Sequence, residues 1–399
     1  MTMRENKLFI ELNDIFLTMA VVVLKEDLQP EVKIQKKIKL NCESIFDSET
    51  KNQIINKIKS ELKLVEQEAK SVFNNFSLIL DNNNVDSINF TGTKKLNGAQ
   101  IYKEDISHII NNLKNCVFDL EREKKIIHLF NSKFLLDNKE VENLPIGLSG
   151  EIYHHQLSFI FLNEKVFKDL NYIFGNSNLK IERIILKNFL KGVETFKKKN
   201  LDTYINLEIG QKKSNINIFY KSSLIHCENF NFGTDIIYRD VQKICSLKEN
   251  NIINLISEIC FDNIFEKKDL QNFLDEKYFI GEKFRKISFE HIYNIIQARV
   301  EEIQNILFNK NINLNFFKNN ITPLLININD ENFLKNFKKM FINSTNYSSS
   351  IEIKKTQDDL TNIFLHASDL INNGWSKEAL PLIHEKKSFI SSIFSRFFD

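Results

Sequence analysis

The stretch Tyr204–Phe230, YINLEIGQKKSNINIFYKSSLIHCENF, decides the fold because it holds three short runs of alternating apolar and polar residues. The runs are Tyr204–Ile209, Asn215–Tyr220 and Leu224–Phe230, and a period of two over such lengths predicts half-buried strands. The turn Gly210-Gln211-Lys212-Lys213 has one glycine, whereas a phosphate-binding hairpin needs several to bring backbone N–H groups close to an anion. This turn is either a nucleotide loop that has lost its glycines or an ordinary polar turn of a meander.

The N-terminal part of the chain has the same arrangement. Lys7–Leu12, Phe16–Leu24 and Val32–Leu40 are typical of three strands, and Ser48–Val72 has the apolar spacing of a long helix. After the three central runs, Asp235–Leu247 again has helical spacing. One unit of three strands and a helix therefore occurs twice, about half a chain apart, although no repeat is visible residue by residue.

A different block lies between these two units. Phe73–Leu80 and Val85–Thr93 are predicted to form a strand pair, and Lys103–Leu120 a helix opened by acidic residues. Ile126–Leu136 and Glu151–Leu162 are predicted as two further strands. The sequence therefore predicts an insert of strand, helix, strand and strand.

The C-terminal part is dominated by predicted helices. Phe289–Asn309 has the clearest apolar stripe, and Ser288 precedes it as a candidate N-cap. Asp358–Ile371 is predicted as the last helix of the body, and Ile371–Lys387 as a connector.

Composition excludes several classes of function. The 54 Lys and Arg residues balance 52 Asp and Glu residues, so no global field attracts nucleic acid. The five cysteines form no Cys-x-x-Cys pair, which indicates a reduced cytoplasmic protein. His154 and His155 are adjacent and on a strand point to opposite faces, so no shared metal is expected. The longest apolar run, Ile15–Leu24, is too short to span a bilayer.

The stretch Ser388–Phe398 has the pattern of a membrane-surface helix. At about 100° per residue, its apolar residues fall on one half of the helical wheel and its polar residues on the other. Such a helix is about 16 Å long, far short of a roughly 30 Å hydrocarbon core, so it would lie in the interface. A terminal helix docked on the protein's own core is the alternative. The residues expected to bind the membrane are Phe389, Ile390, Ile393, Phe394, Phe397 and Phe398, with Lys386, Lys387 and Arg396 facing anionic head groups.

Three motifs resemble those of the FtsA family of bacterial cell-division proteins, which has the actin fold. The segment 145–150, PIGLSG, is similar to the family's Pro-x-Gly-x-Ser-Gly before an alternating strand. The segment 233–240, GTDIIYRD, is similar to the family's Gly-x-x-hydrophobic-Thr-x-Asp helix start, with Tyr238 in place of the threonine. The segment 295–302, IIQARVEE, is similar to its Ile-Ile-x-x-Arg-x-x-Glu helix. The order and spacing of these motifs extend the resemblance over essentially the whole chain.

The resemblance implies an α/β, actin-like two-lobe fold with a ribonuclease-H-like duplication, a strand–helix–strand–strand insert and a C-terminal amphipathic helix. The domain boundaries expected from it are 1–72 for the first lobe (completed by 163–200 and 352–371), 73–162 for the insert, 201–351 for the second lobe with a helical tip at about 242–300, 372–387 for a linker and 388–399 for the amphipathic helix.

The resemblance also implies a nucleotide site, whose motifs are altered here. In place of the family's Asp/Glu-Ile-Gly-Thr the chain has NDIF at 13–16, and in place of Asp-Ile-Gly-Gly-Gly-Thr it has EIGQKK at 208–213. The family's Gly-Gly turn at adenosine is replaced by LININ at 325–329. Because three glycine-dependent contacts are lost together, ATP and Mg²⁺ are expected to bind weakly or not at all. No catalytic residue is expected, and hydrolysis is expected to be absent or very weak. The residues of this vestigial nucleotide site are Asn13, Asp14, Glu208, Gly210, Gln211, Lys212, Gly233, Asp235 and Arg299.

The partners implied by the resemblance are the tubulin-like protein FtsZ, other division proteins, the inner face of the cell membrane and further copies of the chain. The copies would join head to tail, with the insert of one contacting the second lobe of the next. The candidates for contact with the FtsZ tail are Arg285, Lys286, Ser288 and Asn294. Two alternatives remain: a pilus-assembly-type platform that binds a partner's tail and needs no terminal amphipathic helix, and an active actin-fold ATPase, which needs a glycine cradle.

Overall fold

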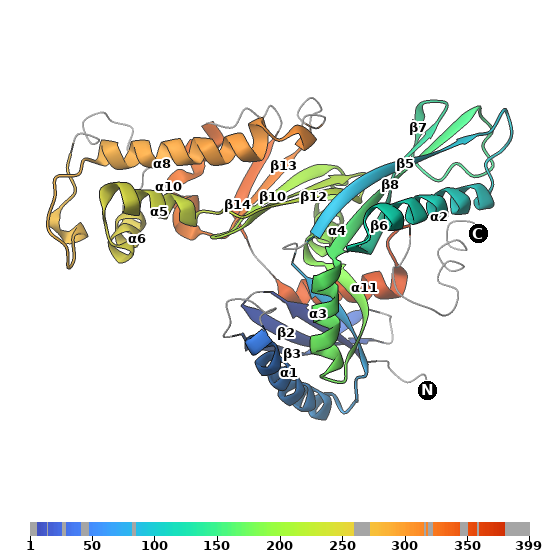
Figure 1. Ribbon diagram of the computed structural model, residues 1–399, viewed down its shortest axis with the longest axis horizontal. Coiled ribbons are helices and arrows are strands. Elements are labelled where there is room, and N and C mark those ends of the chain that lie inside the picture. Colours follow the sequence, from blue (N-terminus) through green and yellow to red (C-terminus); the bar gives the residue numbers. More distant parts are fainter. Residues whose placement is uncertain are drawn as a thin grey trace. The chain divides into compact units, whose positions relative to one another are not determined.

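The computed structural model describes residues 6–13, 15–25, 29–40, 48–81, 85–258, 272–314, 317, 322–343, 350–356 and 359–379 (Figure 1). The chain divides into two compact units. Unit 1 comprises Met1–Asp202, Phe219–Glu228 and Asp358–Asp399, and unit 2 comprises Thr203–Ile218 and Asn229–Gln357.

A five-stranded sheet forms the base of unit 1, in the order β3-β2-β1-β4-β9. The neighbours β1, β2 and β3 are antiparallel, whereas β4 runs parallel to β1 and β9 parallel to β4. Nearly every residue of β1 and β2 is buried, as is typical of strands covered on both faces. These strands are β1 (Asn6–Leu12), β2 (Phe16–Leu24), β3 (Pro30–Lys39), β4 (Asn75–Leu80) and β9 (Lys180–Leu186).

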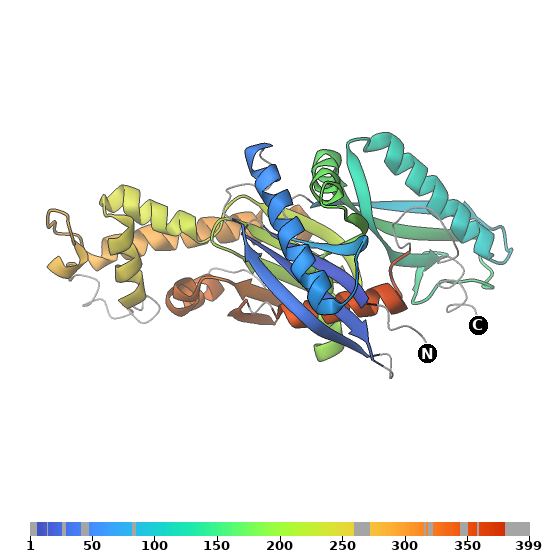
Figure 2. The same ribbon diagram turned by 90° about the horizontal axis from the view of Figure 1, so that it is seen from below.

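Helices cover both faces of this sheet. The helix α1 (Ser48–Ala69) lies across β2 and β3 (Figure 2), because Ile58, Leu62 and Val65 form a buried stripe at helical spacing. The opposite face carries α11 (Leu360–Asn373). Two further helices, α3 (Glu164–Gly175) and α4 (Lys187–Lys199), flank β9 in the chain.

A second five-stranded sheet has the same strand order, β12-β11-β10-β13-β14. Its fourth strand, β13, is parallel to both of its neighbours, as β4 is in the first sheet. The repeated unit predicted from the sequence is thus confirmed as a duplication of topology. The strands are β10 (Tyr204–Ile209), β11 (Ser214–Tyr220), β12 (Ser223–Phe230), β13 (Leu324–Ile328) and β14 (Ile351–Lys355).

The insert is a four-stranded antiparallel sheet in the order β5-β8-β6-β7, with one long helix. The helix packs closely on β5, because a Cβ atom at Gly92 would lie 2.3 Å from the Cγ2 atom of Ile109. Gly147, in the PIGLSG motif, has a φ of +80° and its N–H bonds the carbonyl of Ile101. The elements are β5 (Val85–Lys95), α2 (Lys103–Leu120), β6 (Lys124–Leu136), β7 (Lys139–Val141) and β8 (Ile152–Asn163).

Two of the expected boundaries are wrong. The segment 73–80 was expected to pair with Val85–Thr93 in the insert, but β4 lies between β1 and β9 in the first sheet. Its nearly uninterrupted burial is that of a parallel central strand. Residues 352–355 were expected to complete the first lobe, but β14 pairs with β13 of the second sheet.

The helices of unit 2 follow β12 in the chain. The N-cap expected at Ser288 is confirmed, because its hydroxyl accepts the N–H of His291 at 3.2 Å. The predicted helix to Asn309 ends as an α-helix at Gln304 and continues as one π-helical turn. No described helix is long and apolar enough to cross a membrane. The helices are α5 (Asp235–Cys245), α6 (Glu249–Glu258), α8 (Phe289–Gln304) and α10 (Glu331–Asn343).

The segment Trp375–Ala379, which we name the strap, was expected to be part of a linker, 372–387. It is instead part of unit 1. The N–H of Asn131 donates to the carbonyl of Lys377, and the N–H of Ala379 to the carbonyl of Leu129, both at 2.7 Å, so the strap pairs with β6. The tail expected to form a membrane helix, 388–399, lies outside the described residues.

Candidate functional site

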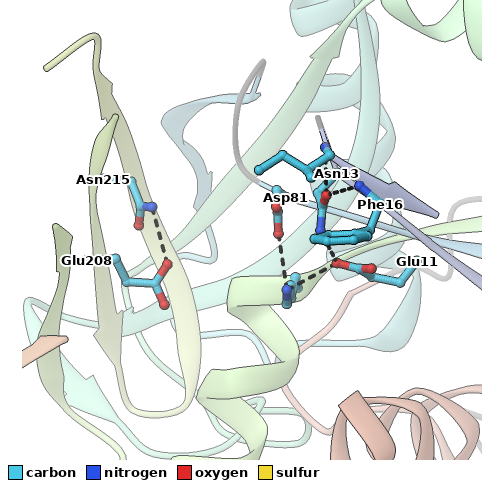
Figure 3. A network of polar contacts seen from close by, with 8 residues as sticks. Glu11, Asn13, Phe16, Asp81, Glu208 and Asn215 are labelled. Carbon is cyan, nitrogen blue, oxygen red and sulfur yellow. Dashed lines mark hydrogen bonds and ion pairs between the residues drawn. The ribbon is translucent and has the colours of Figure 1, made fainter. Parts of the chain in front are cut away.

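The β1–β2 turn of unit 1 lies at one half of the expected nucleotide site. The turn closes when the N–H of Asn13 donates to the carbonyl of Phe16 at 3.0 Å. The side-chain oxygen of Asn13 accepts two more backbone N–H groups, from Ile15 at 2.9 Å and from Phe16 at 2.7 Å (Figure 3). Asp14 lies outside the described residues. The backbone N–H groups of Ile15 and Phe16 are therefore bound by the side chain of Asn13, which belongs to the same turn.

A buried ion pair lies beside this turn. The Nζ atom of Lys187, the first residue of α4, is 3.1 Å from Oε1 of Glu11 and 3.7 Å from Oδ1 of Asp81. The side chains of Lys187 and Glu11 are only 5% and 1% exposed. The side-chain amide of Asn13 donates to the same Glu11 oxygen at 3.2 Å (Figure 3). The Glu11 carboxylate thus accepts hydrogen bonds from both Lys187 and Asn13.

The two turns correct the alignment of the first motif. In the second sheet the turn closes through Gly210 N–H to the carbonyl of Lys213 at 3.0 Å, and Glu208 is the residue before last in β10. In the first sheet the residue before last in β1 is Glu11, and the turn begins at Asn13. The acid at the strand end is therefore Glu11, whereas the sequence comparison placed Asn13 there.

Sequence reasoning missed Glu11 and Lys187 because 176 positions separate them. A signal was present for each. Glu11 is the only charged residue in LFIEL and Lys187 the only one in IILKNFL, and charged groups inside such apolar runs need a partner.

The turn of the second sheet is closed against the start of α5. The N–H groups of Thr234 and Asp235 donate to the carbonyls of Gly210 and Gln211, at 3.0 and 2.9 Å. Gly233 permits this approach, because a Cβ atom there would lie 2.2 Å from the Gly210 oxygen. Free N–H groups at a helix start are the usual site for a phosphate. Here the N–H groups of Thr234 and Asp235 are already bonded to carbonyls of the 210–213 turn.

The other predicted residues of the second half have separate roles. Glu208 accepts the side-chain amide of Asn215 at 3.3 Å (Figure 3). Gln211 and Lys212 are exposed on the turn, and Asp235 pairs with Arg239 at 3.6 Å. Arg299 on α8 is not gathered with this turn but pairs with Asp240 of α5 and with Glu302.

The tyrosine that replaces the family's threonine has an internal partner. The hydroxyls of Tyr238 and Thr234 donate to one oxygen of Asp330, at 3.0 and 2.9 Å. Burial first, and the Asp330 carboxylate second, raise the pKa of Tyr238 above its ordinary value. The other Asp330 oxygen accepts the N–H of Phe333 near the start of α10 at 2.9 Å. This aspartate ties α5 to α10.

The helical tip holds the four residues proposed to contact a partner. Arg285 is half-buried and donates to the carbonyl of Ser246 at 2.7 Å, so it holds the tip's own fold. Lys286 and Asn294 are exposed, and Ser288 caps α8.

Exposed apolar side chains accompany Lys286. Its Nζ atom lies over the ring of Phe273, 5.9 Å from the centroid, and Phe284 packs edge-on against Phe279 at 5.2 Å. Phe273, Ile280 and Phe284 are 52%, 66% and 42% exposed. We name Phe273, Ile280, Phe284 and Lys286 the tip surface.

The residues present do not fit a bound nucleotide with its cation. In unit 1 the Glu11 carboxylate is paired with an ammonium group, and the turn's donors are bound to Asn13. In unit 2 the first donors of α5 are bound to turn carbonyls. Among the described residues no group of three or more His, Cys, Asp or Glu side chains could hold a metal ion.

Comparisons with known proteins find a similar inserted domain, a distant relative and similar folds. The family model of the SHS2 domain inserted in FtsA matches residues 82–153. The cell division protein FtsA of Buchnera aphidicola is 21% identical over 180 residues, 45% of this chain and 42% of the relative, so the match spans less than half of that protein.

Solved structures align with this chain over most of its length. The PilM–PilN type IV pilus biogenesis complex aligns with a TM-score of 0.51 at 11% identity, over 93% of this chain and 99% of the other. MreB5 of Spiroplasma citri bound to AMPPNP aligns with a TM-score of 0.43 at 12% identity, over 93% and 100%. The resemblance to the FtsA family stated from the motifs is confirmed, and the chain has an α/β, actin-like two-lobe fold.

Proposed function

We propose that this chain is a cell-division scaffold that links FtsZ to the cytoplasmic face of the bacterial cell membrane without hydrolysing ATP. The observation that carries the proposal is the insert at 82–153, because it matches the domain inserted in FtsA and lies within an actin-like fold. The absence of hydrolysis is supported by the two turns, whose donors are bound within the protein.

The tip surface is the proposed site for the FtsZ tail. Its exposed aromatic and aliphatic side chains offer anchors, and Lys286 adds a positive charge beside them. A short peptide with acidic and apolar residues is complementary to such a surface. Arg285 is a weaker candidate than the sequence indicated, because its guanidinium is bonded to Ser246 and Glu282. Asn294 and the N-cap Ser288 lie on the adjoining α8.

Fluorescence anisotropy with a labelled peptide of the FtsZ C-terminal tail tests this site. Combining Phe284→Ser with Lys286→Glu removes an anchor and reverses the charge, and should weaken binding at least tenfold, which corresponds to about 1.4 kcal/mol. The matched control is Lys168→Glu on α3, whose lysine side chain is 74% exposed. Equal affinity of the double variant and the control would show that the peptide does not use the tip surface.

Head-to-tail polymerisation and recruitment of other division proteins complete the proposal. A contact between the insert of one copy and the second lobe of the next does not close on itself, so it makes filaments. Phe118 and Leu120 at the end of α2 are 73% and 68% exposed and offer the insert an apolar contact. A chain that remains monomeric at high concentration on anionic vesicles would contradict this part.

A second candidate is a pilus-assembly-type platform. The chain aligns with the PilM–PilN complex over nearly its whole length, a similarity that shows the fold alone. Such a platform binds a partner's tail and needs no terminal membrane helix. Membrane binding that is unchanged after deletion of 388–399 would therefore favour the platform.

A further inference from the structure

The β1–β2 turn has the form of an anion site that is filled from within. Neighbouring backbone N–H groups in a turn make a concavity that binds anions. At this turn the N–H groups of Ile15 and Phe16 converge on one atom, the side-chain oxygen of Asn13, at 2.9 and 2.7 Å (Figure 3). A neutral amide oxygen thus occupies the position that an anionic oxygen would need.

One oxygen of the acid beside the turn is bound from within, whereas its other oxygen, Oε2, is buried and accepts no hydrogen bond from the described residues. Glu11 is 1% exposed, and its Oε1 atom accepts Lys187 at 3.1 Å and Asn13 at 3.2 Å. Asp81, which follows β4, supplies a second carboxylate 3.7 Å from the same ammonium group. Burying an isolated carboxylate is costly, so a positive charge is needed at this place in the folded chain. The lysine brings that charge from α4.

We propose that Asn13 and Lys187 are built-in substitutes for a nucleotide's phosphate oxygen and its cation. The amide oxygen holds the turn, and the ammonium group places one positive charge beside the carboxylates of Glu11 and Asp81. This proposal rests on the part of the proposed function that says the chain does not hydrolyse ATP. It does not depend on binding of FtsZ or of the membrane.

The pairing of Glu11 with Lys187 predicts how substitutions of the two residues combine. Lys187→Met leaves the buried Glu11 charge without its partner, whereas adding Glu11→Gln removes that charge with little change in shape. A lysine that served only to fill space would not show this suppression, because methionine replaces most of its volume. The two substitutions are therefore expected to be strongly non-additive.

Thermal unfolding of the full-length chain, with and without millimolar Mg–ATP, tests the proposal. Lys187→Met should lower Tm by roughly 10 °C, and Glu11→Gln with Lys187→Met should recover at least half of that loss. The control is Lys51→Met on α1, whose lysine pairs with Asp169 at 2.7 Å in a less buried place, and whose loss should be small. If Lys187→Met alone does not fold, the double variant should still be purified as a folded protein.

Three results would overturn the proposal. One is a rise of more than about 2 °C in the Tm of the unaltered chain with Mg–ATP, since a ligand that binds the folded state raises Tm. Another is a double variant as unstable as Lys187→Met. The third concerns Asn13→Gly, which removes the built-in acceptor and should lower Tm by a few degrees. An unchanged Tm for Asn13→Gly would show that the amide oxygen does not hold the turn.

Discussion

At the scale of single residues, the adjacent pair His154 and His155 shows how a strand separates two like side chains. His154 is half-buried and its Nδ1 atom lies 2.8 Å from the hydroxyl of Thr93. His155 is fully buried and bonds the side-chain oxygen of Asn131 at 2.8 Å. Their opposite orientation was predicted from the period of two, and it is confirmed.

This difference predicts a pH dependence. Burial lowers the pKa of His155 from 6.5 to about 3. Between those pH values the unfolded chain binds a proton that the folded chain does not, so acid lowers the free energy of unfolding. The loss from pH 7.5 to 5.5 is about 1.4 kcal/mol for this histidine.

Urea unfolding at the two pH values measures the effect. His155→Gln should reduce the acid-induced loss by about that 1.4 kcal/mol, and His154→Gln is the control for removing a histidine from the same strand. Equal losses in all three proteins would show that His155 is not held neutral by burial.

At the scale of elements, the strap is held by a buried ionic network. Glu378, 3% exposed, accepts Arg183 from β9 and His128 from β6. The Nε2 atom of His128 accepts the N–H of Leu186 at 3.2 Å, so Nδ1 carries the proton that reaches Glu378. Burial alone would raise the pKa of Glu378, but Arg183 and His128 together hold it below its ordinary value. The strap therefore joins the insert to the first sheet.

We expect Glu378→Gln to destabilise the chain strongly. The amide leaves the buried Arg183 charge uncompensated, and its NH2 group must face one of two donors, His128 Nδ1–H or the Arg183 guanidinium. The loss should be about 3–5 kcal/mol in the free energy of unfolding. The measurement is urea unfolding with the exposed Glu142→Gln as control, which should stay within about 0.5 kcal/mol. A Glu378→Gln variant as stable as the control would mean that the strap is held by its backbone and Trp375 alone.

Local patterns predicted most elements, and contacts between distant segments explain what was missed. The alternation of Tyr204–Phe230 and the cap at Ser288 depend on neighbours in the sequence, so both were predictable. The assignment of β4 was wrong because the sequence pattern of a short apolar strand does not determine which sheet the strand joins. The pairing of Glu11 with Lys187 likewise depends on the parallel strands that bring α4 beside β1.

At the scale of the whole molecule, one topology appears twice and one insert interrupts its first copy. Both sheets have the order third, second, first, fourth and fifth strand. The sequence predicted this duplication from element order alone, because the two copies share no visible residue pattern. The insert carries the family signature at 82–153, and the sheets carry the fold.

The central claim is that the chain carries FtsZ to a membrane through its tail. A single short amphipathic helix binds lipid marginally, so attachment depends on many copies acting together. The segment 388–399 has the pattern for such a helix, and Phe394 lies in its apolar half. Phe394→Asp places a charge in the membrane-facing half without shortening the chain.

Co-sedimentation of FtsZ polymers with anionic vesicles tests this claim most directly. The unaltered chain should bring FtsZ into the vesicle pellet, whereas deletion of 388–399 and Phe394→Asp should each reduce FtsZ there to background. Circular dichroism should show that both variants remain folded. If the deleted chain still carries FtsZ to the vesicles, or if the unaltered chain never does, the proposed tether is wrong.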